Sequence, residues 1–127
     1  MSKKIDFKKA QFFVAWERAS PSQKHHIRHF TPKIAFIGRS NVGKSSLLND
    51  LVQKPLAAAA KKPGRTHQIV CYLVDEKLFL IDLPGYGYAK TSQESQEKWS
   101  LAIDSFLQGQ LNLQICWLLD SRREELS

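Results

Sequence analysis

A glycine-rich segment that ends in a lysine and a hydroxyl residue carries the strongest chemical signal in the sequence. Residues 38–45 read GRSNVGKS and match the pattern G-x-x-x-x-G-K-[ST]. In this pattern the backbone amides turn inward around a phosphate, the lysine reaches the terminal phosphates and the hydroxyl ligates magnesium. We therefore expect Lys44 to bind phosphate and Ser45 to bind Mg²⁺. The alternative is a glycine turn with an exposed lysine.

A carboxylate further along the chain could complete the metal site. Asp82-Leu83-Pro84-Gly85 follows the apolar run 78–81. An acidic residue at the carboxyl end of a strand faces a ligand at the edge of the sheet, where it can hold magnesium through water. The Gly85 amide would then meet a terminal phosphate, in a segment whose conformation depends on that phosphate. The alternative is an ordinary turn, since turns commonly contain Asp-x-x-Gly.

Thr66 is a third candidate ligand. It ends a loop that begins near Lys54 and contains the run Ala57–Ala60 and a Pro63-Gly64 turn signal. A hydroxyl at this place can ligate magnesium and close over the nucleotide. A threonine that only begins a strand is the alternative.

These residues need a strand, a loop and a helix to position them, and the hydrophobic pattern predicts all three. Residues 33–38 form a short apolar run that ends in glycine, which is typical of a buried strand. A helix follows, with an apolar stripe that we expect to pack on the sheet, formed by Leu47, Leu48, Leu51 and Val52. This context favours a phosphate-binding loop over a simple turn.

The elements beyond the loop predict a mixed sheet. Residues 67–74 and 77–82 are two β-rich segments, joined as an antiparallel hairpin by Asp75-Glu76. A second helix starts near Thr91, where Thr91 and Glu94 form a capping box, and it ends at Gly109. Its expected apolar stripe consists of Trp99, Ile103, Phe106 and Leu107.

The two ends of the chain differ in how clearly they are predicted. The apolar run 113–119, closed by Asp120, indicates a buried strand. Residues 7–18 fit an amphipathic helix or an extended arm, and the pattern does not decide between them.

Composition limits the class of protein but does not indicate a function. The chain has 127 residues, of which 43% are hydrophobic and 24% charged, as expected for one domain. No apolar run approaches the roughly 18 residues of a membrane-spanning helix, and no signal peptide is evident, so we expect a cytoplasmic protein. Cys71 and Cys116 lie in apolar runs and are expected to be reduced, buried thiols. The net charge of +7 favours an anionic partner such as RNA.

Three motifs together resemble one family of GTPases. Residues 38–49 (GRSNVGKSSLLN), 63–66 (PGRT) and 82–90 (DLPGYGYAK) closely resemble the EngB (YihA) family. With Asp120-Ser121-Arg122-Arg123 the resemblance runs from about Lys33 to Arg123.

The resemblance implies a fold and a function. The fold would be α/β, a P-loop NTPase of the Ras-like G-domain type, with a mixed, mostly parallel sheet, flanking helices and an incomplete C-terminal side. Residues 1–32 would be an N-terminal arm, and residues 33–127 a partial G domain with phosphate loop, switch I, switch II and a strand ending at Asp120. The protein would bind GTP or GDP with Mg²⁺. It would assist assembly of the large ribosomal subunit by binding rRNA or ribosomal proteins. A link to cell division and septum formation is also implied, without a membrane or DNA partner.

The family pattern assigns nucleotide and metal contacts but no catalytic residue. Ser45, Thr66 and Asp82 would be the metal ligands. Tyr86 stands where Ras-like enzymes have a water-positioning glutamine, so hydrolysis should be slow. Asn41 resembles the asparagine of potassium-activated GTPases, although it could also only brace the loop. The expected nucleotide contacts are Gly38, Arg39, Ser40, Asn41, Val42, Gly43, Lys44, Ser45, Ser46, Gly64, Arg65, Thr66, Asp82, Leu83, Pro84 and Gly85.

Two departures from the family pattern keep other functions open. Ala60-Lys61-Lys62 replaces the usual hydroxyl residues before Pro63, and the guanine-reading motif [NT]-K-x-D is absent. We therefore expect a C-terminally truncated G domain whose last strand leaves an uncovered apolar edge and promotes aggregation. The main alternative is a non-catalytic phosphate- or RNA-binding module without guanine specificity. A P-loop kinase or ATPase is disfavoured, because Asp82–Gly85 and Thr66 form a switch pair.

Overall fold

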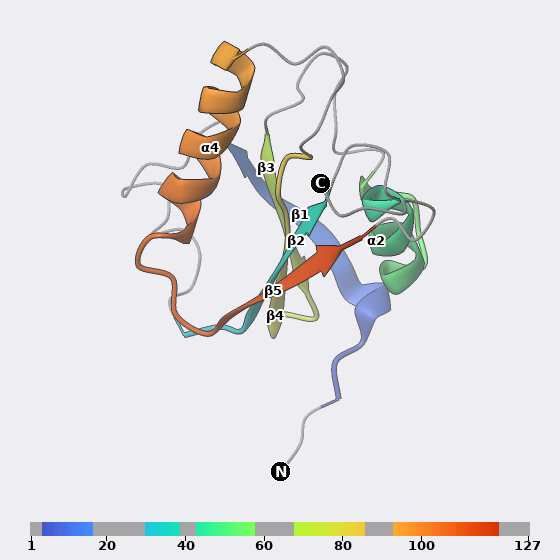
Figure 1. Ribbon diagram of the computed structural model, residues 1–127. Coiled ribbons are helices and arrows are strands. Elements are labelled where there is room, and N and C mark those ends of the chain that lie inside the picture. Colours follow the sequence, from blue (N-terminus) through green and yellow to red (C-terminus); the bar gives the residue numbers. More distant parts are fainter. Residues whose placement is uncertain (1–3, 17–29, 39–42, 58–67, 86–92, 120–127) are drawn as a thin grey trace.

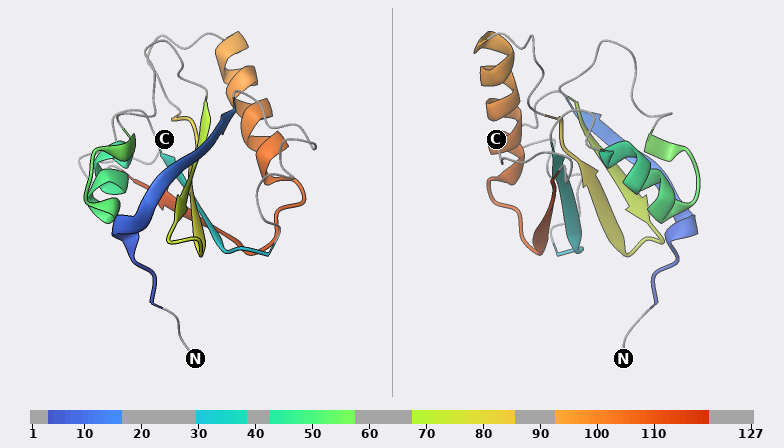
Figure 2. Two further views of the ribbon diagram at one scale, coloured as in Figure 1. Left: turned by 180° about the vertical axis from the view of Figure 1, so that it is seen from behind. Right: turned by 45° about the vertical axis from the view of Figure 1, so that its right-hand side comes forward.

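A single sheet with a helix on each face forms the framework of the protein (Figures 1 and 2). The computed structural model describes residues 4–16, 30–38, 43–57, 68–85 and 93–119. In chain order the elements are η1 (Phe7–Lys9), β1 (Ala10–Trp16), β2 (Lys33–Gly38), α2 (Lys44–Val52), β3 (Ile69–Val74), β4 (Leu78–Asp82), α4 (Gln93–Leu107) and β5 (Leu113–Leu118).

The five strands are arranged in the order β1-β3-β4-β2-β5. β2 pairs in parallel with β4 on one side and with β5 on the other, whereas β3 is antiparallel to both β4 and β1. The predicted mixed sheet is therefore confirmed. Because β2 and β4 are parallel neighbours, their last residues, Gly38 and Asp82, lie on the same side of the sheet, where the carboxyl ends of the strands meet.

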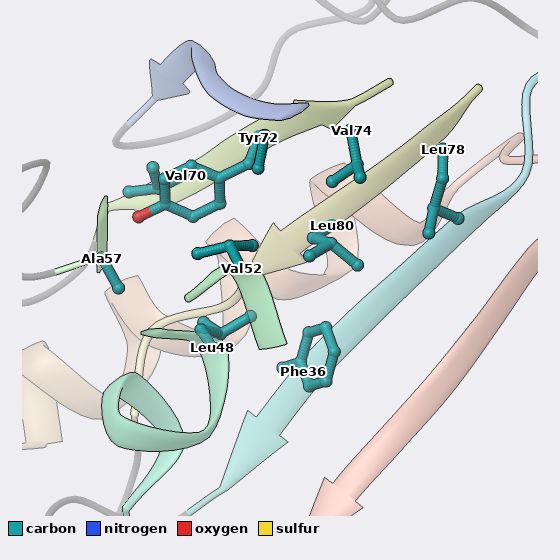
Figure 3. Close-up of a cluster of buried hydrophobic side chains, with 10 residues drawn as sticks. Phe36, Leu48, Val52, Ala57, Val70, Tyr72, Val74, Leu78 and Leu80 are labelled. Atoms are coloured by element: carbon teal, nitrogen blue, oxygen red, sulfur yellow. The ribbon is translucent and has the colours of Figure 1, made fainter. Parts of the chain in front are cut away.

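Alternating side chains of β3 and β4 divide the core between the two faces of the sheet. On one face Val70, Tyr72 and Leu80 pack with Leu48 and Val52 of α2 (Figure 3). On the other face the side chains pack with Ile103 and Phe106 of α4. Figure 2 shows α2 and α4 on opposite sides of the sheet. Every residue of β3 and β4 is buried, because both faces are covered and both edges are paired.

The segment whose form the sequence left open is extended. Its first residues form the short helix η1, and β1 then pairs with the outer edge of β3, from Ala10 opposite Val74 to Trp16 opposite Ile69. A β-bulge lies between Phe12 and Val14. The Phe13 ring packs edge-on against Phe79, with ring centroids 5.0 Å apart. Pairing with β3 thus decides a local pattern that was ambiguous alone.

The predicted hairpin is confirmed, with a longer connection than expected. The turn covers residues 75–77, so β4 begins at Leu78 rather than at Lys77. Asp75 and Glu76 have φ angles of 52° and 56°, and the amide of Lys77 donates a hydrogen bond to the carbonyl oxygen of Val74 at 3.0 Å. Two consecutive positive φ angles are typical of the turns that match the twist of a hairpin.

The second helix is also confirmed. Ile103 and Phe106 are buried and Leu107 packs against them, as the stripe predicted. Gly109 has a φ of 74°, a conformation that favours glycine, and it follows the end of α4 as expected. Thr91 lies outside the described residues, as do the side chains of Glu94 and Trp99, so the capping box stays a prediction.

The expectation that the last strand is buried is wrong, although the strand itself is confirmed. Ile115 is 56% exposed and Trp117 62% exposed. The reason is that β5 is an edge strand: within the described residues it pairs only with β2. The uncovered apolar edge that we expected at this place is therefore present.

Candidate functional site

The candidate site lies where β2 and β4 end side by side. Phe36 is the register partner of Asp82, and the amide of Leu83 donates a hydrogen bond to the carbonyl oxygen of Phe36 at 3.1 Å. This bond continues the pairing of the two segments past the end of β4. The sheet thus holds the Asp82-Leu83 segment beside the chain that leads to α2.

Gly43 and Lys44 begin the helix that the motif requires. Gly43 has a φ of 99°, which a residue with a side chain rarely adopts. Its carbonyl oxygen accepts the hydrogen bond from the amide of Leu47 at 2.9 Å and so starts α2. Gly43 provides no side-chain cap, and the positive end of the helix dipole lies at Lys44, an arrangement that suits an anion.

Lys44 and Asp82 meet directly. The Nζ atom of Lys44 lies 2.6 Å from Oδ1 of Asp82, with side-chain exposures of 6% and 0%. The same ammonium group also donates a hydrogen bond to the carbonyl oxygen of Leu83. Two groups that the sequence assigns to one ligand complex are therefore within contact distance of each other.

The charge of Asp82 also affects the neighbouring strand. Burial, with a smaller contribution from the Asp82 carboxylate, raises the pKa of Cys71 and of Tyr72 above their usual ranges. Cys71 is therefore a protonated thiol in the core, in keeping with the reduced, buried cysteine expected there. Cys116 is only half-buried.

The oxygen groups at this edge fit a magnesium ion. Asp82 supplies a carboxylate and Ser45, in the first turn of α2, a hydroxyl, and both are hard oxygen ligands. Mg²⁺ usually keeps several waters and takes one or two protein ligands besides phosphate oxygens. Such a site does not need a cluster of three acidic or metal-binding side chains, and the described residues contain none.

The structure brings together only part of the predicted contact set. Gly38, Gly43, Lys44, Ser45, Ser46, Asp82, Leu83, Pro84 and Gly85 are described and lie at or beside the ends of β2 and β4 and the start of α2. The remaining predicted contacts lie outside the described residues, so their roles stay predictions; they are Arg39, Ser40, Asn41, Val42, Gly64, Arg65 and Thr66.

Sequence reasoning missed two groups at this place. The carbonyl oxygen of Leu83 carries no sequence signal, because every residue has one. The side chain of Asn49 accepts a hydrogen bond from the amide of Ala57 at 2.8 Å and so ties α2 to the start of the loop that leads to Thr66. Asn49 ends the motif GRSNVGKSSLLN, and an amide late in a helix was a signal that could have been followed.

A second buried lysine serves the framework and not the site. Lys33 is the first residue of β2 and lies at the end of the parallel strands opposite to Asp82. Its ammonium group donates hydrogen bonds to the carbonyl oxygens of Thr31 at 3.0 Å and of Leu111 at 2.9 Å. Burial lowers its pKa. These bonds join the entries of β2 and β5.

Comparisons with known proteins identify relatives of the same kind. A family model described as 50S ribosome-binding GTPase matches residues 33–127. The "Probable GTP-binding protein EngB" of Solibacter usitatus is 51% identical over 94 residues, covering 72% of this chain and 49% of that protein. The protein of the same name from Thermoanaerobacter pseudethanolicus is 41% identical over 112 residues, covering 87% and 58%. The chain thus spans about half the length of these relatives.

Among solved structures, the "Crystal structure of a probable GTP-binding protein engB" matches with 37% sequence identity and a TM-score of 0.49. The match covers 59% of this chain and 40% of that one. Within the described residues, neither helix has the length and apolar character needed to cross a membrane.

Proposed function

Because the chain belongs to the 50S ribosome-binding GTPase family and is of the EngB type, we propose that it binds GTP and GDP and acts as a nucleotide-dependent switch. One observation carries the proposal: the Lys44 ammonium lies 2.6 Å from the Asp82 carboxylate, at the edge where β2 and β4 end. A phosphate-binding lysine and a magnesium-binding carboxylate that serve one metal–triphosphate complex have to lie near each other.

Each residue of the site has a distinct task in this proposal. Lys44 neutralises the terminal phosphates, and the amides at the start of α2 bind phosphate oxygens. Ser45, Thr66 and Asp82 would hold Mg²⁺, Asp82 through water, and the bound metal would spread the phosphate charge. Asn41 would hold a potassium ion near the phosphates. The other contacts named above would line the nucleotide.

The proposed output of the switch is a change in two loops. GTP would order residues 54–66 and 84–89, and these loops would then dock on rRNA or ribosomal proteins of the large subunit or its precursor. The net charge of +7 supports an RNA partner. Roles in large-subunit assembly, cell division and septum formation, and a cytoplasmic location, belong to this proposal.

Hydrolysis would be slow in the isolated protein. Tyr86 replaces the glutamine that positions water in Ras-like enzymes, and no residue of the sequence is assigned as a catalytic base. We therefore expect binding to be measurable where turnover is small.

One observation favours a second candidate function. The 127 residues contain no [NT]-K-x-D motif, and without that motif a phosphate-binding loop discriminates poorly between bases. The second candidate is accordingly that these 127 residues by themselves bind phosphate or RNA without guanine specificity and without turnover.

Nucleotide competition separates these functions. A fluorescent GTP analogue is bound to the protein and displaced with unlabelled GTP or ATP in the presence of Mg²⁺. Displacement by GTP alone supports the proposed function, equal displacement by GTP and ATP or no binding of either supports the second candidate, and preference for ATP indicates a kinase or ATPase. Lys44→Ala should weaken binding at least about tenfold. Lys77→Ala, in the distant β3–β4 turn, is the matched control and should not.

A further inference from the structure

The hydroxyl group of Tyr72 lies in the core without a partner. Tyr72 is 2% exposed and belongs to the part of the core that packs against α2. Its hydroxyl oxygen is inaccessible to water and has no hydrogen-bond partner among the residues that the structure describes. Such a group is costly, because it has lost its hydrogen bonds to water and gained none in return. The hydroxyl therefore destabilises the arrangement that surrounds it.

A narrow gap lies between Tyr72 and the segment 53–57, which follows α2. The gap is too small to hold a water molecule, and it is lined by Leu48, Val52, Leu56, Ala57, Tyr72 and Leu80. Figure 3 shows the Tyr72 ring extending from β3 toward the side where Ala57 lies. The other lining residues belong to α2, β3 and β4, so Leu56 and Ala57 form the part of the wall that can move most readily.

Asn49 of α2 holds this segment against the helix. Its backbone carbonyl oxygen accepts a hydrogen bond from the amide of Lys54 at 3.2 Å. Its side-chain oxygen accepts one from the amide of Ala57 at 2.8 Å. The Lys54 ammonium group adds an exposed tether to η1, a hydrogen bond to the carbonyl oxygen of Lys8 at 3.1 Å. The Asn49 side chain is thus the group that fixes the far end of the segment beside Tyr72.

We infer that the segment 53–57 is a latch with a closed and an open position. The Asn49 side chain favours the closed position, which the structure shows. The Tyr72 hydroxyl favours the open position, because only there can it form hydrogen bonds to water. The chain continues from Ala57 into the loop that contains Thr66, so the latch sets how readily the first residues of that loop leave α2. The inference does not rest on the proposed function, since it concerns the chain without nucleotide.

The opposing interpretation is that the Tyr72 hydroxyl is only a defect of the core. Removing the hydroxyl would then stabilise the whole fold against unfolding, while local opening of the segment 53–57 would stay the same. The two interpretations thus differ in what they expect for the Ala57 amide, whose hydrogen bond to Asn49 is broken when the latch opens.

The first test measures amide hydrogen exchange of the nucleotide-free chain by NMR. Tyr72→Phe keeps the ring and removes the hydroxyl, so opening of the latch no longer gains hydrogen bonds to water. Exchange of the Ala57 amide should slow at least about fivefold, the factor that corresponds to the cost of one unsatisfied buried hydroxyl. The Lys77 amide, which donates to the carbonyl oxygen of Val74 in the β3–β4 turn, is the control and should exchange at an unchanged rate.

The second test asks whether Asn49 and Tyr72 act on the same segment. Tyr72→Phe should raise the Tm of the otherwise unmodified chain by about 3 °C or more. Asn49→Ala removes the oxygen that binds the Ala57 amide, so the hydroxyl is already hydrated when the latch is open. In that background the gain from Tyr72→Phe should fall by at least about half. Asn49→Asp keeps an oxygen at this place and is the matched control, in which the full gain should remain.

Slower exchange at Ala57 alone, together with a gain in Tm that depends on Asn49, supports the latch. An unchanged Ala57 rate, an equal slowing at Ala57 and Lys77, or the same gain in Tm in every background overturns it. A lower Tm in Tyr72→Phe also overturns it, because the hydroxyl would then have a partner in the closed position. None of these measurements involves nucleotide, so failure of the proposed function would appear only in the nucleotide competition.

Discussion

β4 and β5 both pair with β2 in parallel and both are apolar in sequence, yet every residue of β4 is buried and none of β5 is fully buried. β4 has β2 on one side, β3 on the other, and helices over both faces. β5 has one strand neighbour within the described residues, and Ile115 and Trp117 are exposed. The comparison teaches that an apolar run predicts a strand, whereas its burial is decided by neighbours that lie elsewhere in the sequence.

The largest expected effect is a difference in unfolding free energy between substitutions in the two strands. Phe79 on β4 is fully buried and packs against Phe13, so Phe79→Ala should lower the free energy of unfolding by about 3–5 kcal/mol. Trp117 on β5 is 62% exposed, and Trp117→Ala should lower it by about 0.5 kcal/mol or less. Guanidinium unfolding followed by circular dichroism measures both losses. Tryptophan fluorescence is unsuitable, because Trp117→Ala itself removes a tryptophan.

Phe79→Leu keeps the comparison measurable if Phe79→Ala does not fold, because it removes less volume and should cost less. Equal losses of unfolding free energy at Phe79 and Trp117 would show that β5 is covered in solution and would contradict the difference in burial between β4 and β5.

The next effect is a loss of stability at alkaline pH that belongs to the covered part of the sheet. Burial raises the pKa of Cys71 from its ordinary value of 9.0 and that of Tyr72 from 10.0, so the folded state keeps both protons where the unfolded state has lost them. Stability present below about pH 9 should fall as pH rises, with a slope that approaches about 1.4 kcal/mol per pH unit for each group. Urea unfolding at a series of pH values measures it.

Cys71→Val should delay this loss until the range where Tyr72 titrates. Cys116→Val removes the same group from β5, where it is only half-buried, and serves as the matched control. An alkaline loss that survives in Cys71→Val but disappears in Cys116→Val would reverse the assignment of the two strands.

The same contrast marks how far sequence alone predicts this fold. β2, α2, β3, β4, α4 and β5 were all predicted: the helices from their hydrophobic period, and the strands from short apolar runs bounded by turn signals. β1 was not, since residues 7–18 suit a helix or a strand locally and the open edge of β3 decides between them. The apolar residues of β5 predicted a buried strand, because residue types within a strand do not indicate which other elements cover it.

The candidate site was predictable to a similar extent. Motif spacing indicated Lys44 and Asp82, because phosphate and magnesium chemistry demand those side chains after strands. Their direct contact was not expected, since each had been assigned to a ligand and not to the other. The carbonyl oxygen of Leu83 was out of reach for the same reason that any backbone atom is: its position depends on the fold, not on the residue type.

The smallest expected effect on stability accompanies a clear effect on association. An exposed apolar edge strand without charges invites pairing between molecules, and residues 113–119 contain no charged residue. We expect the unmodified chain to associate with increasing concentration in sedimentation velocity, and Trp117→Lys to shift it toward monomer, because a lysine at a strand edge opposes such pairing. The free energy of unfolding should change by only about 0.5 kcal/mol.

Leu101→Lys is the control: Leu101 is 48% exposed on α4, away from the edge, and the same gain of charge there should leave association unchanged. A monomeric chain with a cooperative melt at ordinary temperature would contradict this prediction, and an equal effect of both lysines would assign association to net charge instead of to the β5 edge.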